Sequence, residues 1–185
     1  MIAASPYTLP FTTLFDEHEL GKNSWMMILH ASRIPPHVGL MIGGAYSSLT
    51  IKGHELNLSA DVLLQTIARK KIEALAVKLV KQPVFSNDYQ REVLELCIRQ
   101  FPKVEANKAS CLSPVKLFLQ EFYAIPYQPD EMLFEIAEKL NQNQYIEKVL
   151  AFNLKDSASS GEFVLPMYSK ERLHDVIAAE TAQLL

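Results

Sequence analysis

The stretch HVGLMIGGAYSSLT, residues 37–50, decides the fold, because it has the pattern of an antiparallel hairpin. Gly43-Gly44 suits a two-residue turn in which both residues need a positive φ angle. That turn pairs Ile42 with Ala45 and, further along the two strands, His37 with Thr50. We therefore expect two short strands, with His37 at the start of the first.

The two faces of this hairpin differ in polarity. One face is apolar and carries Val38, Leu40, Ile42, Leu49 and Ile51. The other is mostly polar and carries His37, Gly39, Met41, Tyr46, Ser48, Thr50 and Lys52. A slip of one residue would mix the two sets, so the alternation supports this register. It places His37 on a polar face, beside the gap left by Gly39.

Helical spacing of apolar residues dominates the centre of the chain. We expect helices over residues 59–81 and 86–101, capped by Ser59 and Ser86, then a third from about residue 110 and a fourth over 130–140. Ser169 caps a last helix. Residues 24–30 form a buried strand, and residues 148–154 and 162–165 form a second hairpin. We predict a single α+β domain over residues 1–185, with an antiparallel sheet packed against helices and a helical insertion at about 59–101.

Composition restricts the partners. Eighteen basic residues against 21 acidic ones give a net charge of −3, which argues against nucleic acid as the main partner. No apolar run is long enough to predict a membrane span. The first 20 residues do not have the pattern of a secretory signal, which favours a cytoplasmic protein, with a mature secreted form left open. Two cysteines favour a reducing compartment.

Cys111 is the candidate nucleophile, because it lies where the third helix begins. Either Ser110 caps that helix, or Ser113 does and Pro114 takes the first helical position. In both cases the positive end of the helix dipole lowers the pKa of the thiol. The structural alternative is a small cysteine buried under the helix start. Cys97 lies mid-helix on an apolar stripe and is expected to be structural.

His37 is the candidate general base, because the pKa of an imidazole lies near neutrality. A third group must orient the ring. Thr50, directly opposite in the hairpin, is our candidate for it; Ser48 is one diagonal away, and Glu55 lies just past the strand. A backbone carbonyl is a further alternative. We expect the pair His54-Glu55 to belong to a solvated turn.

We expect no metal and no cofactor. No pair of histidines has the helical spacing of a zinc protease, and neither a Gly-Lys-Ser/Thr loop nor a dinucleotide-binding fingerprint is present.

Over roughly residues 24–125 the sequence resembles the circularly permuted branch of the NlpC/P60 papain-like cysteine enzymes. The similar elements are the strand that follows His37 and the later helix that opens at Cys111. The resemblance implies a papain-like fold, attack of a thiolate on an amide or ester carbonyl, and a thioester intermediate. Members of the group act on cell-wall peptides, other amides or lipid acyl groups. The third catalytic position departs from the pattern, since no His, Glu, Asp or Asn evidently fills it.

Our leading hypothesis is a thiol hydrolase or acyltransferase in which Cys111 is the nucleophile, His37 the general base and Thr50 the third residue. Its substrate would be a small molecule, a peptide or a lipid. The alternatives are a non-catalytic binding or interaction domain on the same fold, and a regulatory partner protein with an exposed apolar stripe on the 59–81 helix. The oligomeric state is left open.

Overall fold

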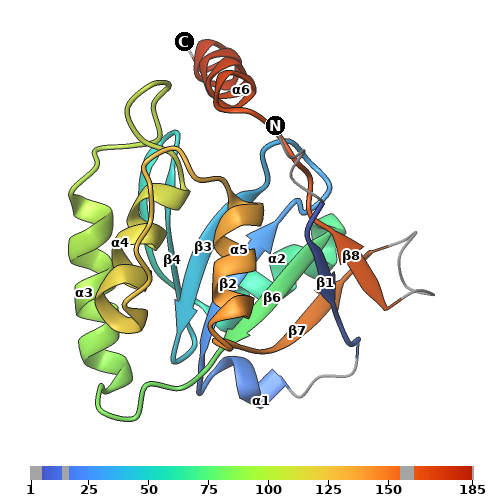
Figure 1. The fold of residues 1–185 in the computed structure, drawn as a ribbon, viewed down its shortest axis with the longest axis vertical. Helices are drawn as coiled ribbons and strands as arrows, with labels where there is room; N and C mark the ends of the chain where they lie inside the picture. The colour runs from blue at the N-terminus through green and yellow to red at the C-terminus, as the bar shows by residue number, and fades with distance from the viewer. Residues whose placement is uncertain (1–5, 14–16, 155–160, 185) are drawn as a thin grey trace.

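The structure, a computed structural model, describes residues 6–13, 17–154 and 161–184 and has an α+β architecture (Figure 1). Its strands are β1 (Thr8–Pro10), β2 (Ser24–Leu29), β3 (His37–Ile42), β4 (Ala45–Thr50), β5 (Gly53–Ser59), β6 (Ala74–Leu79), β7 (Ile146–Phe152) and β8 (Glu162–Val164). Its helices are α1 (Glu17–Leu20), α2 (Ala60–Lys70), α3 (Asn87–Arg99), α4 (Leu112–Tyr123), α5 (Leu133–Gln142) and α6 (Lys170–Ala182).

Six strands form one antiparallel sheet in the order β5-β4-β3-β2-β6-β7. The strands β1 and β8 pair with each other in a separate two-stranded sheet. The predicted α+β class with an antiparallel sheet is therefore confirmed.

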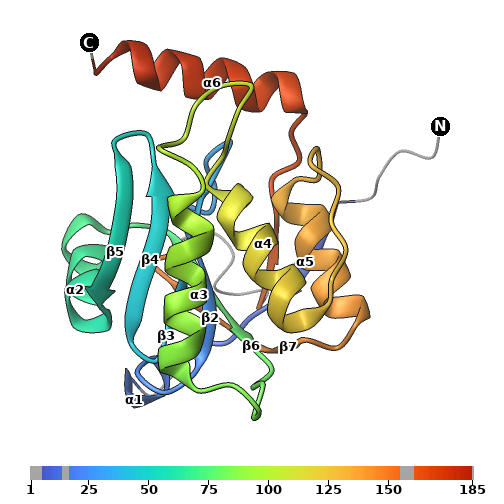
Figure 2. The ribbon, with the colours of Figure 1, turned by 90° about the vertical axis from the view of Figure 1, so that its left-hand side faces the viewer.

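Both faces of the large sheet are buried. In β2, Met26 and Ile28 pack into the core beneath α3, α4 and α5, whereas Trp25 and Met27 pack on the opposite side with α2. Figures 1 and 2 show these helices on the two sides of the sheet, with α6 lying across one end of the molecule. Burial on both sides explains why β2 is an unbroken apolar run.

The two predicted strands and their turn are confirmed, and the predicted register holds near the turn. The regular pairing ends at Leu40–Ser47, so the predicted pairing of His37 with Thr50 is not formed. Gly43 and Gly44 have φ angles of 56° and 81°, and β3 pairs with β4 through Ile42–Ala45, Met41–Tyr46 and Leu40–Ser47. One expectation about its faces is also wrong. The face predicted to be mostly polar is buried, because Met41 and Tyr46 pack in the core beside α2.

The predicted helix over residues 59–81 is wrong in its second half. Ser59 does cap α2, with its hydroxyl accepting from Val62 N–H, but the helix ends at Lys71 in the left-handed conformation. The chain then forms β6, a central strand that is buried throughout. Short apolar runs fit a buried strand and a buried helix equally well, so periodicity alone does not separate them. The stretch 59–101 is consequently α2, β6 and α3 rather than a helical insertion.

The predicted second hairpin is also wrong. β7 pairs with β6, and β8 pairs with β1, so residues 148–154 and 162–165 do not pair with each other. The turn predicted between them falls mainly on residues 155–160, which lie outside the described residues. The predicted solvated turn at His54-Glu55 is instead the start of β5, a sheet-edge strand.

The remaining helices follow the sequence prediction. Ser86 accepts a hydrogen bond from Tyr89 N–H at 3.2 Å and caps α3, and Ser169 caps α6 in the same way through Arg172 N–H at 3.3 Å. Among the described residues, no helix combines the length and the apolar character needed to cross a membrane.

Candidate active site

Cys111 occupies the position just before the first residue of α4. The two serines around it make the local hydrogen bonds: Ser110 Oγ accepts from Leu112 N–H at 3.2 Å, and Ser113 Oγ accepts from Ser110 N–H at 3.0 Å. Both serines thus contribute to the helix start, and Cys111 itself takes the cap position between them. The expectation of a thiol at a helix N-terminus is confirmed.

The loop before α4 holds Cys111 against the sheet where β3 and β4 separate. Val104 N–H from this loop donates to Thr50 O at 2.9 Å, so the end of β4 pairs with the loop. The thiol donates to Pro36 O, with Sγ and O 3.9 Å apart, and the main-chain N–H of Val38 favours the thiolate and lowers the thiol pKa. Alternate residues of a strand direct their main-chain groups to the same neighbour. Sγ therefore lies along the same edge of β3 that pairs with β4 nearer the hairpin turn.

Burial dominates the chemistry of this thiol. It raises the pKa of Cys111, and the N–H groups of Val38, Cys111 and Leu112 oppose that increase without cancelling it. The predicted lowering of the thiol pKa by the helix dipole is therefore wrong, because desolvation of the thiolate is the larger effect. Cys97 differs in position: it is buried on the inner face of α3, and burial raises its pKa to about 11.

His37 is the first residue of β3 and is partly buried. Its ring is held at Nε2 by a side chain of β4. His37 Nε2 lies 3.1 Å from Ser48 Oγ, and the Ser48 hydroxyl donates to Glu55 Oε2 at 3.2 Å. Since Ser48 gives its only proton to the carboxylate, its oxygen accepts from His37 Nε2–H. The lone pair of the neutral ring is then on Nδ1. Burial, and to a lesser degree His30, lowers the pKa of His37 to about 4, so the ring is neutral near pH 7.

Thr50, our candidate for the third residue, has a different partner. Its hydroxyl donates to Gly53 O at 3.0 Å and accepts from Lys52 N–H at 3.1 Å, which stabilises the turn between β4 and β5. The structure brings Ser48 to His37 in place of Thr50.

A shift in strand register explains how Glu55 reaches Ser48, the partner of His37. The pairing of β4 with β5 changes register between Tyr46 and Ser48, after which Ser48 lies opposite Glu55. Irregularities of this kind redirect side chains next to functional sites. The diagonal position of Ser48 relative to His37 was visible in the hairpin pattern, whereas the register shift had no signal in the sequence.

The side chain of Tyr46 packs against Gly39 and reaches towards Ser48. A Cβ atom at Gly39 would lie 2.6 Å from Cε2 of the tyrosine ring and 2.6 Å from the Tyr46 hydroxyl oxygen, so only glycine fits opposite it. The Tyr46 hydroxyl is buried near Ser48, which opposes the rise in its pKa that burial causes, but no described residue meets hydrogen-bond geometry with it. The gap predicted beside His37 at Gly39 is therefore filled by an aromatic ring.

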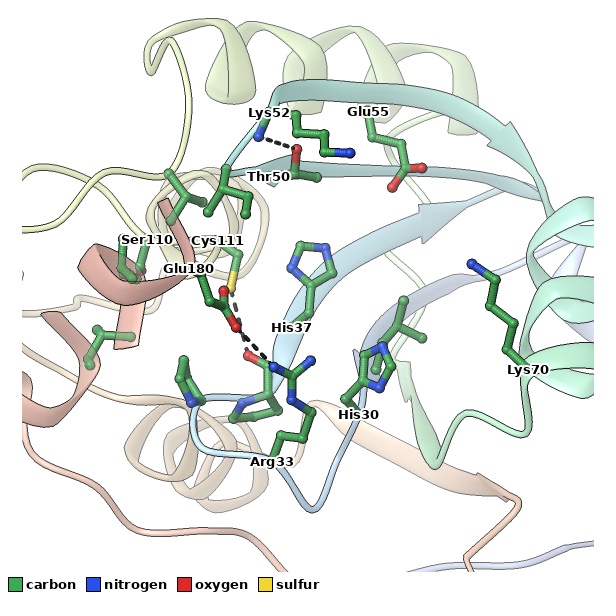
Figure 3. A pocket seen from close by; sticks show the side chains of 17 residues that line it. His30, Arg33, His37, Thr50, Lys52, Glu55, Lys70, Ser110, Cys111 and Glu180 are labelled. Atoms are coloured by element: carbon green, nitrogen blue, oxygen red, sulfur yellow. Dashed lines mark hydrogen bonds and ion pairs between the residues drawn. The ribbon is translucent and has the colours of Figure 1, made fainter. Parts of the chain in front are cut away.

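Cys111 and His37 line one pocket of about 690 Å³ between the sheet edge and α6 (Figure 3). Apolar side chains form part of its wall: Leu29, Ile51, Val104, Leu173 and Ile177. Ionisable groups form the rest: His30, Arg33, Lys52, Glu55, Lys70 and Glu180. These ionisable residues are far apart in the chain, so neither their grouping nor the place of α6 in the wall had a signal in the sequence.

The pocket presents a thiol, a neutral imidazole and main-chain donors on one surface. In the part of the chain that the structure describes, no group of three or more His, Cys, Asp or Glu side chains is arranged to hold a metal ion. Comparisons with protein-family models, with curated proteins and with solved structures found no match.

Proposed function

We propose that this protein is a thiol hydrolase or acyltransferase with a papain-like arrangement in permuted order, in which Cys111 is the nucleophile and His37 the general base. One observation carries the proposal. The thiol lies against the main chain next to His37: Sγ is 3.9 Å from Pro36 O, and Val38 N–H lowers the thiol pKa. The His37 ring itself is held at Nε2 by Ser48, which is bonded to Glu55. A nucleophile, a base and a group that orients the base are the three parts that such an enzyme needs.

The reaction starts from a neutral pair. With the pKa of Cys111 raised and that of His37 lowered, a thiol and a neutral imidazole are present near pH 7. In the step we propose, the Cys111 thiol turns from Pro36 O to His37. Its proton moves to His37 Nδ1 as Sγ bonds to the substrate carbonyl carbon. The carbonyl oxygen becomes an oxyanion, and the main-chain N–H groups that act on the thiol, those of Val38, Cys111 and Leu112, are our candidate donors to it.

The intermediate then collapses to a thioester. The protonated His37 gives its proton to the leaving amine or alcohol as the bond to carbon breaks. Water, or a second alcohol or amine, next attacks the thioester carbon and gives a proton to His37. The carbon–sulfur bond then breaks, the acid or acyl product leaves, and His37 returns the proton to Sγ. Ser48 and Glu55 stabilise the imidazolium that forms twice in this cycle.

Acylation by an activated ester tests the proposal. Incubation with p-nitrophenyl acetate should release a burst of nitrophenolate and leave an acetyl group that peptide mapping places on Cys111. Cys111→Ser should abolish the burst, and the matched control Cys97→Ser should keep it. His37→Gln should slow acylation by roughly 100-fold or more, which is the usual contribution of a positioned base.

Two results would overturn the proposal: acetylation of Cys97 as fast as that of Cys111, or acylation of the His37→Gln variant at the wild-type rate. Circular dichroism of each variant separates loss of chemistry from loss of folding.

The raised pKa of Cys111 and its hydrogen bond to Pro36 O favour a second candidate, a binding domain without catalysis. In that case the thiol is a structural link between α4 and β3. The two candidates differ in the same experiment, because a structural thiol gives no burst and its replacement by serine lowers the stability of the fold.

A further inference from the structure

The wall of the pocket beside Cys111 contains an ion pair between Arg33 and Glu180. The Arg33 Nη2 and Glu180 Oε1 atoms lie 2.9 Å apart, and the two side chains are 59% and 39% exposed. Arg33 belongs to the loop between β2 and β3, and Glu180 to the last part of α6. Figure 3 shows the Glu180 carboxylate directed across the pocket to the guanidinium, on the same side as Cys111 and His37.

Further cations surround this pair. Lys52 and Lys70 line the same pocket, and neither forms an ion pair with another described residue. His30 lies in the same wall and has a lowered pKa, chiefly from burial and then from the charges of Arg33 and Lys70. Of the two pocket carboxylates, Glu55 is bonded to Ser48, which leaves Glu180 as the one that faces Arg33.

We propose that Arg33 is the anion-binding residue of the pocket, and that Glu180 occupies it at rest in place of a carboxylate carried by the substrate. The inference rests on the proposed function and names its substrate class: an amide or ester with a carboxylate close to the bond that Cys111 attacks. The group seated on Arg33 is itself a carboxylate, which is why a carboxylate is preferred to a phosphate.

Replacing Glu180 on Arg33 by a substrate carboxylate costs little free energy. Ion pairs between exposed side chains are weak because water and salt screen them, so an incoming carboxylate displaces Glu180 readily. A guanidinium binds a carboxylate through two parallel N–H donors, which fixes the orientation of the substrate. α6 has other attachments, since His174 Nδ1 accepts from Asn107 N–H at 2.9 Å and Lys170 pairs with Asp130. The helix therefore stays in place when Glu180 is released.

Two alkylating reagents that differ in charge test the site. Iodoacetate carries a carboxylate, and iodoacetamide is its neutral counterpart. The rate ratio of the two reagents at Cys111, divided by their ratio at free glutathione, measures the preference of the pocket for an anion. Glu180→Gln should raise this ratio by roughly tenfold, and Arg33→Gln should lower it. The double variant should behave like Arg33→Gln alone.

Matched controls remove the same charges elsewhere. Glu92→Gln on α3 and Lys81→Gln beyond β6 should leave the ratio unchanged, because neither residue lines this pocket. A ratio that is equal in the wild type, Glu180→Gln and Arg33→Gln, with normal labelling by iodoacetamide, overturns the anion site and leaves the proposed function intact. The proposed function is judged separately by the p-nitrophenyl acetate burst, because the raised pKa of Cys111 slows alkylation by both reagents at neutral pH.

A binding measurement keeps the anion site testable without a reactive thiol. N-acetylglycine should raise the melting temperature of Glu180→Gln more than that of the wild type, and should have no effect on Arg33→Gln. The neutral N-acetylglycinamide should have no effect on any of them. If inorganic phosphate stabilises Glu180→Gln and N-acetylglycine does not, the assignment to a carboxylate is wrong.

Discussion

The Nε2 atom of His37 lies 3.1 Å from Ser48 Oγ, across two strands whose regular pairing has already ended. This contact fixes which nitrogen of the ring carries the proton. Because Ser48 in turn donates to Glu55, the side chains form a chain from the carboxylate to the base.

The free energy of unfolding should fall between pH 6.5 and pH 4 because of His37. Its pKa is about 4 in the folded protein and near the ordinary 6.5 in the unfolded chain. Between these values the unfolded chain binds the proton more strongly, so acid favours unfolding, by up to about 3 kcal/mol. Urea denaturation at a series of pH values measures this slope. The slope should become clearly shallower in His37→Gln, with a remainder from His30, whose pKa is also lowered. It should persist unchanged in His54→Gln, a histidine on the exposed sheet edge.

The Ser48→Ala variant should lose activity, whereas Thr50→Ala should lose stability. Removing the Ser48 hydroxyl takes away the acceptor for His37 Nε2–H, and we expect kcat/KM for p-nitrophenyl acetate to fall by roughly tenfold or more. Removing the Thr50 hydroxyl breaks the turn contacts to Gly53 and Lys52 and costs about 1 kcal/mol in the free energy of unfolding. Equal losses of activity in the two variants would contradict the role assigned to Ser48.

Gly39→Ala should destabilise the protein by about 1–3 kcal/mol, because the new Cβ would lie 2.6 Å from the buried ring of Tyr46. Gly21→Ala is the matched control, since its Cβ would meet its nearest neighbour at an ordinary 3.6 Å. Thermal unfolding of the two variants compares them directly. Similar melting temperatures for both would show that the Tyr46 ring is free to move.

Tyr46→Phe should leave the free energy of unfolding unchanged or raise it by up to about 1 kcal/mol. The hydroxyl is buried, and none of the residues that the structure describes forms a hydrogen bond of regular geometry with it, so its removal relieves a desolvation cost and opens little space. Urea denaturation gives the sign. A clear loss of stability would mean that the hydroxyl has a partner in solution.

Local patterns predicted the elements that carry the catalytic candidates. Gly43-Gly44 set the turn and the register of β3 with β4, because both positions require a positive φ angle. Serine caps marked the starts of α2, α3 and α6 correctly, since capping depends on groups only a few residues apart. The buried position of Cys97 also followed from helical spacing alone.

The errors came from segments whose state depends on distant partners. Residues 74–79 have an apolar pattern that fits a helix, and only pairing with β2 and β7 makes them a strand. Likewise, β7 and β8 look like one hairpin but pair with different strands. Such choices are decided by which surfaces are available for burial, and a single sequence does not state them.

The sequence by itself determined the hairpin that presents His37 and the helix start that presents Cys111, because turns and caps are built from neighbouring residues. Only the tertiary structure decided what those side chains do. It placed Ser48 and Glu55 behind the imidazole, buried the thiol enough to raise its pKa, and laid α6 across the pocket with Glu180 on Arg33. Desolvation and ion pairing depend on groups far apart in the chain, and folding alone brings them together.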